Sequence, residues 1–253
     1  MRPMSSVVID KRFCGPPNSA NGGYACGILA GAVEGSAEVT LRAPPPLGRP
    51  LQLVRSPQST AELQDGATVL GAARGVHLEV AHVPAVSFAE AEDAARRSPY
   101  AGSDHKLPSC FVCGPARAAG DGLRIFVGPL AGGPFRKTGT LAAAWVPFAG
   151  LAGADGRVAS EFIWAALDCP SGFACIAANQ PGTDELILLG RMSARIDDRP
   201  RPGDRCILTA WPTGRDGRKL FASSALLGPQ GEVLAVAQAT WLIVDHQVLR
   251  GRR

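Results

Sequence analysis

Short apolar runs separated by turn residues recur along most of the chain, and this pattern predicts β-strands. The first half holds four such runs between Pro-Gly and Asp-Gly turns, at Val39–Leu41, Leu51–Arg55, Ala61–Leu63 and Val69–Ala73. The second half holds four longer runs, at 186–196, 206–211, 219–227 and 233–244. Shorter runs at 7–13 and 141–146, and the end of 110–126, are further strand candidates.

Two segments break this pattern and predict helices. Gly22–Val33 and Glu161–Ala178 carry small and apolar residues on most faces, so each must be buried on most sides. Pro170 lies inside the second segment, and a proline removes one helical hydrogen bond, so we expect a kink or an irregular turn there. A third helix is expected at the start of 85–108, which then turns polar and irregular.

The two halves repeat one order of elements: a strand, a buried helix and an antiparallel meander. The turn and strand in "PPPLGRPLQLV" correspond to "RPRPGDRCILTAW", and "LQDGATVLGAA" corresponds to "GPQGEVLAVAQA". Matches in the same order predict an internal duplication, with an N-terminal unit at 1–94, a connection at 95–137 and a C-terminal unit at 138–253. Pairing the two sheets edge to edge would protect an edge of each.

At "NGGYACGILAG", at "EFIWAALDCPSG" and at the Pro-Gly strand after each, the chain resembles the hotdog-fold thioesterases in their double-hotdog arrangement. The segment "CFVCGP…GDGLRIF" also looks like one found in uncharacterised bacterial members of the superfamily. The resemblance implies an α+β fold, with two antiparallel sheets each wrapped around a central helix and joined into one pseudo-dimeric sheet. It also implies hydrolysis of an acyl-CoA or a related acyl thioester, with an apolar tunnel for the acyl chain.

In that superfamily, one central helix offers backbone N–H groups to the thioester oxygen, and the other supplies an acid. The first N–H groups of a helix have no partner within it, and glycine lets a carbonyl approach them. In this chain Asn21-Gly22-Gly23-Tyr24 opens the first helix, whereas Ala30 or Gly31 stands where its acid would fall. The second helix has the acid, Asp168, but no glycines at its start. We therefore expect one composite site, with Gly22, Gly23 and Tyr24 from one half and Asp168 from the other.

The resemblance leaves Asp168 open as a general base or as a nucleophile. Ser171, on about the same helical face, is a candidate to orient the water or the carboxylate. Gln238 resembles a strand glutamine that helps hold the water in some double-hotdog thioesterases. Asn21, Arg191 and Arg195 are candidate substrate-binding residues, the arginines for coenzyme A phosphates. Plainer interpretations stay open: a helix-interior acid, a packing glycine, a hydroxyl at a kink and solvated arginines.

Composition limits the partners. The 253 residues carry a net charge of +4 from dispersed basic residues, which suits a small anionic ligand better than nucleic acid. The sequence offers neither a run of 18 apolar residues nor the apolar core of a signal peptide, so we expect a cytoplasmic protein without a membrane partner. Seven cysteines at irregular spacing agree with a reducing compartment.

Cys110-x-x-Cys113 raises the possibility of zinc or redox chemistry. Zinc takes four ligands, and the sequence shows no second such pair; even with His105 nearby, a fourth ligand is missing. Structural thiols are the favoured interpretation, and we expect neither a metal nor a cofactor.

Two other functions remain as alternatives. One is a non-catalytic protein that binds acyl groups or coenzyme A. The other, a hydratase or dehydratase, ranks lower, because that chemistry usually needs a histidine in the helix region and neither predicted helix has one. We expect a homodimer that meets through its sheet faces.

Overall fold

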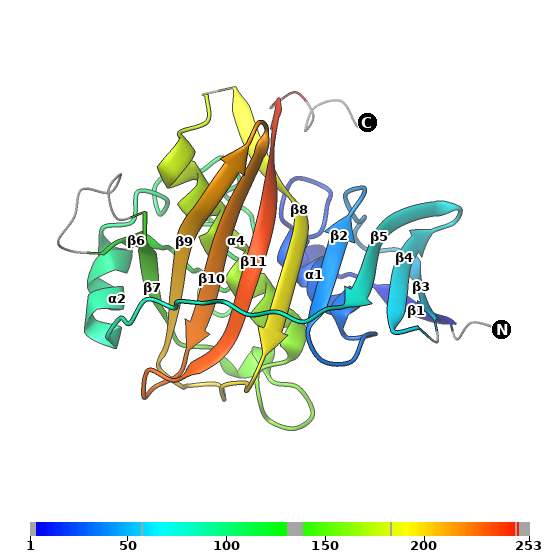
Figure 1. Ribbon diagram of the computed structural model, residues 1–253, viewed down its shortest axis with the longest axis horizontal. Helices are drawn as coiled ribbons and strands as arrows, with labels where there is room; N and C mark the ends of the chain where they lie inside the picture. Colours follow the sequence, from blue (N-terminus) through cyan, green and yellow to red (C-terminus); the bar gives the residue numbers. More distant parts are fainter. Residues whose placement is uncertain (1–3, 57, 131–138, 183, 246, 248–253) are drawn as a thin grey trace.

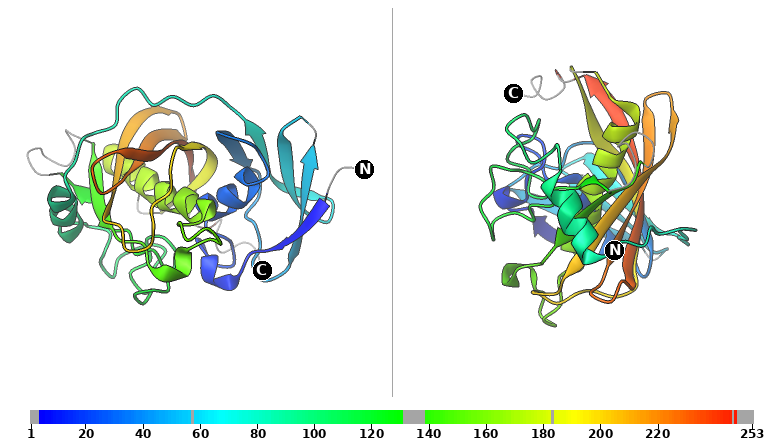
Figure 2. Two further views of the ribbon diagram at one scale, coloured as in Figure 1. Left: turned by 90° about the horizontal axis from the view of Figure 1, so that it is seen from below. Right: turned by 90° about the vertical axis from the view of Figure 1, so that its left-hand side faces the viewer.

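A computed structural model describes residues 4–56, 58–130, 139–182, 184–245 and 247. These residues form one 11-stranded antiparallel sheet with its main helices on one face (Figures 1 and 2). In spatial order the strands are β1 (Met4–Val8), β3 (Pro50–Ser56), β4 (Thr60–Asp65), β5 (Thr68–Gly75), β2 (Ala37–Leu41), β8 (Glu185–Ile196), β11 (Val233–Asp245), β10 (Lys219–Leu227), β9 (Cys206–Asp216), β7 (Leu141–Trp145) and β6 (Gly128–Pro129). The helices are α1 (Gly22–Ala30), α2 (Phe88–Arg96) and α4 (Ser160–Asn179), with 3-10 turns at Lys11–Phe13 and Ala149–Leu151.

The sheet is two similar halves joined in the middle. The junction is the antiparallel pair β2–β8, where Val39 stands opposite Met192 and both are buried. Outward from it, the strands run β2-β5-β4-β3-β1 on one side and β8-β11-β10-β9-β7 on the other. α1 precedes β2, and α4 precedes β8, so the halves share one connectivity. The expected α+β architecture of two joined sheets, each against a helix, is confirmed.

The boundaries proposed at residues 94 and 137 remain a prediction, and residues 131–138 lie outside the described part. α2 falls at the first of these boundaries. It packs against β7 and β6 of the second half, where Ala91 and Ala94 join an apolar cluster with Ala142, Ile207 and Leu227.

α1 and α4 cross in close contact, side by side on the same face of the sheet (Figure 2). A Cβ added to Gly23 would lie 2.4 Å from Asp168 Cβ and 2.7 Å from the Trp164 carbonyl oxygen. A Cβ added to Gly27, one turn later, would lie 2.5 Å from Glu161 Cα. Residues four apart share one helical face. The face of α1 that meets α4 therefore has no room for a side chain at these two positions.

α4 is the central helix of the second half, and it continues through Pro170 without interruption. The irregular turn expected at this proline does not form. Two serine hydroxyls donate to carbonyls beside it: Ser224 Oγ to Leu167 O at 2.8 Å, and Ser171 Oγ to Asp168 O at 2.7 Å. By length and composition α4 could cross a membrane, but 78% of its apolar 18-residue stretch is buried inside the protein, as in a core helix.

The connection between the halves lies over both faces of the sheet. Residues 76–87 cross the face opposite α4 (Figure 1), where Leu78 packs against Ala225 and Val236. The strand expected at the end of 110–126 is wrong, because only Gly128–Pro129 joins the sheet there. The amides of Leu123 and Ile125 instead donate to the carbonyls of Phe111 and Val112, at 2.8 and 2.9 Å. These bonds hold the segment against the loop that carries Cys110 and Cys113, called the cysteine loop below.

Candidate active site

The carboxyl group of Asp168 lies at the crossing of α1 and α4. Asp168 is 2% exposed. Its Oδ2 accepts two hydrogen bonds from the first half of the chain, from Asn21 Nδ2 at 2.9 Å and from the Gly23 amide at 3.0 Å. Its Oδ1 is buried and has no hydrogen-bond partner among the described residues. A buried carboxyl oxygen without a partner is rare in folded proteins and indicates a place for a water or a ligand.

Asn21 connects the start of α1 to this acid. It is the N-cap residue, and its Oδ1 accepts a hydrogen bond from the Tyr24 amide at 2.9 Å, as N-cap side chains do. The amide nitrogen of the same side chain donates to Asp168. One asparagine therefore caps the start of α1 and orients the carboxyl group, although the sequence suggested for it only contact with substrate.

The three backbone amides predicted as oxyanion donors are not equivalent. The Gly23 amide is bonded to Asp168, and the Tyr24 amide is bonded to Asn21. No hydrogen bond is found for the Gly22 amide within the described residues, and Gly22 lines a cavity beside the acid. Of the three, Gly22 is the donor available to a bound molecule.

Tyr24 contributes packing through its side chain. Its ring stacks on Phe13 with centroids 4.2 Å apart, and contacts Phe111 and Phe162 nearby. Burial, with smaller contributions from Glu161 and Asp10, raises the pKa of the Tyr24 hydroxyl, and Arg12 opposes this rise. This aromatic cluster holds the start of α1 against the cysteine loop and α4.

The electrostatics of the site favour a proton on Asp168. Burial is the largest cause, and it raises the pKa of Asp168 to about 7, compared with about 4 for an exposed aspartate. The hydrogen bond from Gly23 lowers the pKa, the neighbouring Cys110 raises it, and the hydrogen bond from Asn21 lowers it. The acid is thus held where both protonation states occur near neutral pH.

A cavity of about 250 Å³ borders the acid. Its wall is mainly apolar and includes Leu41, Pro45, Ile187, Leu189 and Trp241. Asn21 and Asp168 are among the polar residues that line it. Ligand pockets usually measure about 300–1,000 Å³. This cavity is therefore smaller than the long acyl tunnel that the sequence resemblance implies.

Ser171 is buried near the acid, but its hydroxyl faces the helix backbone. It donates to the carbonyl of Asp168 at 2.7 Å and accepts a hydrogen bond from Trp241 Nε1 at 2.9 Å. Neither bond reaches the carboxyl group. The structure therefore does not place Ser171 where it could orient the carboxylate or an attacking water.

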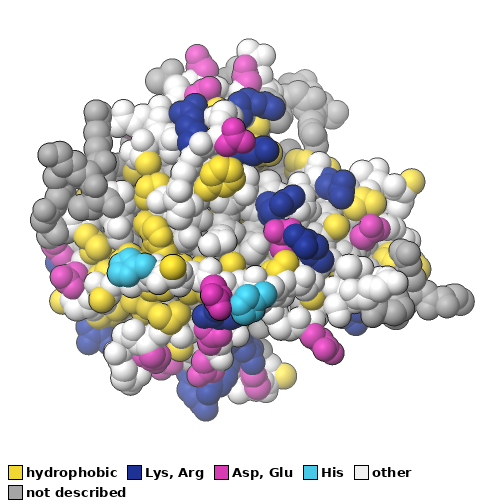
Figure 3. Space-filling model, in the orientation of Figure 1, with side chains coloured by type: hydrophobic (Ala, Val, Ile, Leu, Met, Phe, Trp, Pro, Cys, Tyr) yellow, Lys and Arg dark blue, Asp and Glu magenta, His cyan; other side chains and the backbone are white. Residues whose placement is uncertain are grey.

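Three of the predicted residues lie away from this cavity. Gln238 is exposed on β11 between the buried residues Ala237 and Ala239, which face α4, so its side chain projects from the opposite face of the sheet. Arg191 and Arg195 alternate in the same way on β8, and they pair with Glu38 and Asp197. On this outer face, basic and acidic side chains are interspersed without forming a continuous stripe (Figure 3).

A second cavity, of about 570 Å³, lies at the other end of the helix crossing. It borders Ser160 at the start of α4 and the last turn of α1. Asp168 is nine residues after its N-cap, Ala159, and the equivalent residue of α1, nine after Asn21, is Ala30. The helical acid of the first cavity thus has no carboxyl counterpart at the second, as the sequence predicted at Ala30 or Gly31.

Three thiols beside the acid were not recognised as a group from the sequence. Cys110 and Cys169 line the first cavity, and their sulfurs lie 3.8 Å apart. Cys113 joins them, and all three sulfurs lie within 4.8 Å of one another. Spacing along the chain indicated only the 110–113 pair, because Cys169 is brought in from α4 by the fold.

Comparison with solved structures identifies the architecture. The TesB protein of Mycobacterium avium subsp. paratuberculosis superposes with a TM-score of 0.65 at 11% identity, covering 96% of this chain and 93% of that one. A hot dog fold protein of unknown function from Alicyclobacillus acidocaldarius gives 0.61 at 13% identity, covering 96% and 94%. The fold is a double hotdog. A candidate thioesterase II from Thermobifida fusca gives 0.61 at 15% identity, covering 94% of this chain and 93% of that one.

At such low identity these likenesses concern the double hotdog alone. No family model matches the sequence, and no curated protein matches it. The function must therefore be argued from the residues around Asp168.

Proposed function

We infer that this double-hotdog protein hydrolyses an acyl thioester, an acyl-CoA or a related compound, in the cavity beside Asp168. The observation that carries this proposal is one buried carboxyl group, fixed through Oδ2 by Asn21 and Gly23, with Oδ1 unpartnered among the described residues. A candidate thioesterase II among the proteins of the same fold supports it. The seven cysteines are all free, which suits the reducing cytoplasm.

In the general-base route, a water in the cavity attacks the thioester carbonyl while Asp168 takes its proton. The carbonyl oxygen becomes an oxyanion, and the Gly22 amide is the proposed donor to it. The carbon–sulfur bond then breaks, the thiolate leaves and takes up the proton, and a carboxylic acid remains. Losing one such donor typically costs about 3–4 kcal/mol of transition-state stabilisation.

In the nucleophilic route, a carboxylate oxygen of Asp168 attacks the carbonyl directly. The thiolate leaves, an anhydride forms between Asp168 and the acyl group, and water then cleaves that anhydride. Oδ1 serves both routes, because Oδ2 is engaged by two donors. The small cavity favours substrates with a short acyl group near the acid.

The decisive experiment measures free-thiol release from a panel of short-chain and medium-chain acyl-CoAs. We expect Asp168→Asn, which keeps the shape of the side chain, to lower kcat at least about 100-fold, because the base or nucleophile is lost. Asp198→Asn is the matched control, since Asp198 borders the second cavity instead. Turnover of no thioester by the wild type, or equal kcat for wild type and Asp168→Asn, refutes the assignment.

The rival function is binding of an acyl group or coenzyme A without turnover. The occupied Gly23 and Tyr24 amides favour it over a hydratase, because they leave few donors for catalysis. Calorimetry with a non-hydrolysable thioether analogue distinguishes the two, since a binding protein takes up the analogue and releases no thiol from the thioester. A homodimer remains our proposal for the assembly.

A further inference from the structure

The cluster of Cys110, Cys113 and Cys169 lies outside the proposed hydrolytic chemistry and converges on one point. Cys110 and Cys113 come from the loop between the halves, and Cys169 comes from α4. Cys110 and Cys113 are buried, and Cys169 is half-buried. We propose that these three thiols bind a thiophilic divalent metal ion such as Zn²⁺, next to Asp168.

The spacing of the sulfurs fits such an ion. A tetrahedral zinc site with Zn–S bonds of about 2.3 Å places neighbouring sulfurs about 3.8 Å apart. The Cys110 and Cys169 sulfurs lie 3.8 Å apart, and all three lie within 4.8 Å of one another. His105 is not part of this group. Cys110 and Cys169 border the cavity, so a water or a small ligand in it can supply the fourth ligand.

N–H groups point at the sulfurs, as they do around metal-bound thiolates. Asn21 Nδ2 lies 3.9 Å from both Cys110 Sγ and Cys169 Sγ. The backbone amides of Cys113 and Val112 also donate to the Cys110 sulfur. A metal ion binds the thiolate form, so binding displaces the thiol protons.

The loop that carries two of the thiols is fixed before any ion binds. The Gly114 amide donates to the Cys110 carbonyl at 2.9 Å, and a Cβ on Gly114 would lie 2.5 Å from that oxygen. Only glycine therefore fits directly after the pair. The Phe111 amide, between the two cysteines, donates to the Cys14 carbonyl at 2.7 Å.

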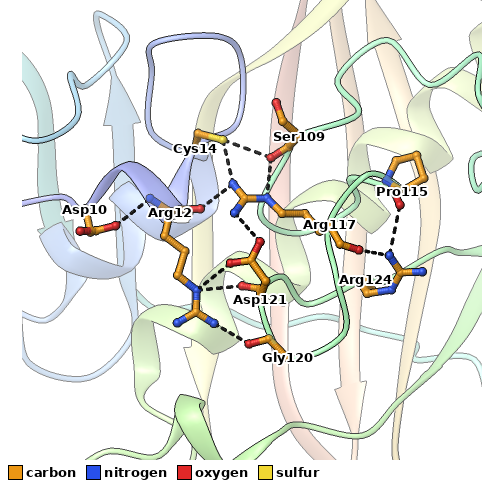
Figure 4. Close-up of polar contacts among 9 residues, drawn as sticks. All are labelled: Asp10, Arg12, Cys14, Ser109, Pro115, Arg117, Gly120, Asp121 and Arg124. Carbon is orange, nitrogen blue, oxygen red and sulfur yellow. Dashed lines mark hydrogen bonds and ion pairs between the residues drawn. The ribbon is translucent and has the colours of Figure 1, made fainter.

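Arginines anchor the same loop to the N-terminal segment (Figure 4). Arg117 Nε donates to the Ser109 carbonyl at 2.8 Å, and Arg117 Nη2 donates to the Arg12 carbonyl at 2.7 Å. Arg12 in turn donates to the carbonyls of Gly120 and Asp121, both at 2.8 Å. A site that is pre-organised in this way loses little entropy when it binds an ion.

A disulfide or simple packing explains fewer of these observations than a bound metal ion does. A disulfide would join two of the sulfurs and leave the third without a role, and it is disfavoured in a reducing compartment. Packed thiols do not require Asn21 or backbone amides to face the sulfurs. Convergence of three sulfurs with N–H groups directed at them favours an ion.

Cobalt provides the direct test, because Co²⁺ substitutes for Zn²⁺ and absorbs strongly when thiolates bind it. Titration of the reduced, metal-free full chain under anaerobic conditions is expected to give a thiolate-to-cobalt charge-transfer band that saturates at one ion per chain. Added Zn²⁺ is expected to abolish the band. Cys113→Ser and Cys169→Ser should each lose it, whereas Cys175→Ser and Cys206→Ser, two buried thiols outside the cluster, should keep it.

A second measurement covers variants that fail to fold. The wild type is alkylated with and without Zn²⁺, and the modified cysteines are mapped by mass spectrometry. Protection of Cys110, Cys113 and Cys169 but not Cys14 supports the site. Absence of the band together with absence of protection overturns the proposal, as does a Cys110–Cys169 disulfide in the reduced preparation. All of these readouts are independent of thioester hydrolysis.

Discussion

Replacing Gly23 with alanine tests whether the helix crossing requires glycine. The added Cβ would lie 2.4 Å from Asp168 Cβ, more than about 1 Å closer than the 3.4–4 Å of ordinary contact, so α1 and α4 must move apart. Overpacking of this kind costs about 1–3 kcal/mol. Weakening the hydrogen bond from the Gly23 amide to the buried carboxyl group costs about 1–3 kcal/mol more. The higher helix propensity of alanine returns about 1 kcal/mol.

The net expectation is a loss of about 1–5 kcal/mol in the free energy of unfolding. In a chain of this size that lowers Tm by about 2–20 °C. Urea denaturation followed by circular dichroism measures the free energy of unfolding, and calorimetry measures Tm.

Two variants in the same region separate the causes. Gly31→Ala is the control, because its Cβ would meet only carbonyl oxygens of its own helix, at 3.6 Å, and its φ of −62° suits alanine. We expect a change within about 0.5 kcal/mol. Gly27→Ala should destabilise like Gly23→Ala, because its Cβ would lie 2.5 Å from Glu161 Cα, but without touching Asp168. Equal stability of Gly23→Ala and Gly31→Ala would refute the reasoning.

Asp168 and Ser224 are buried polar residues and Gln238 is an exposed one, and each position gives a further test. The pKa of Asp168 rises from about 4 in the unfolded chain to about 7 in the folded protein, so the folded state binds more protons between these pH values. The free energy of unfolding of the wild type should therefore fall by about 2–3 kcal/mol from pH 5 to pH 8, relative to Asp168→Asn. Parallel pH curves of the two proteins in urea denaturation would contradict this. Ser224→Ala removes the hydroxyl that donates to Leu167 O and should lower the free energy of unfolding by about 1–2 kcal/mol. Ser223→Ala, at the adjacent buried serine, should change it by no more than about 0.5 kcal/mol. Equal losses in chemical denaturation would contradict the assigned hydrogen bond. Gln238→Ala should leave kcat and KM for any thioester substrate within about twofold, since the side chain lies on the outer face; a tenfold loss of kcat would show that the face assignment is wrong.

The sequence predicted the architecture well because the same turn and strand patterns occur in both halves of a duplicated chain. The turn before β3 matches the turn before β9, and the β4–β5 hairpin matches β10–β11; these are the pairs that stand at equivalent places in the sheet. Both central helices were recognised from their uniform apolar character. The segment ending at Phe126 was wrongly predicted as a strand, because its amides bond to a loop, and only tertiary structure decides that partner.

The candidate site was predictable where the signal is local to one helix. An asparagine before two glycines, and one aspartate in an apolar helix, pointed to the residues that the fold brings together. The outer residues could not be placed in this way. Gln238 and Arg195 depend on which face of a strand they occupy, and shifting the register by one residue reverses that face. Cys169 depends on a contact between α4 and a loop 59 residues earlier in the sequence.

The asymmetry between the two halves explains why the candidate catalytic groups gather at one end of the crossing. Counted from the N-cap of each helix, Asp168 corresponds to Ala30, and Cys169, the next residue, corresponds to Gly31. The end with small residues borders a cavity flanked by paired charges, such as Arg157 with Asp198. The other end holds the acid, the capping asparagine and the three thiols. Gly23 and Gly27 let the two helices cross closely, and that close crossing brings the Gly23 amide within hydrogen-bond distance of the Asp168 carboxyl group.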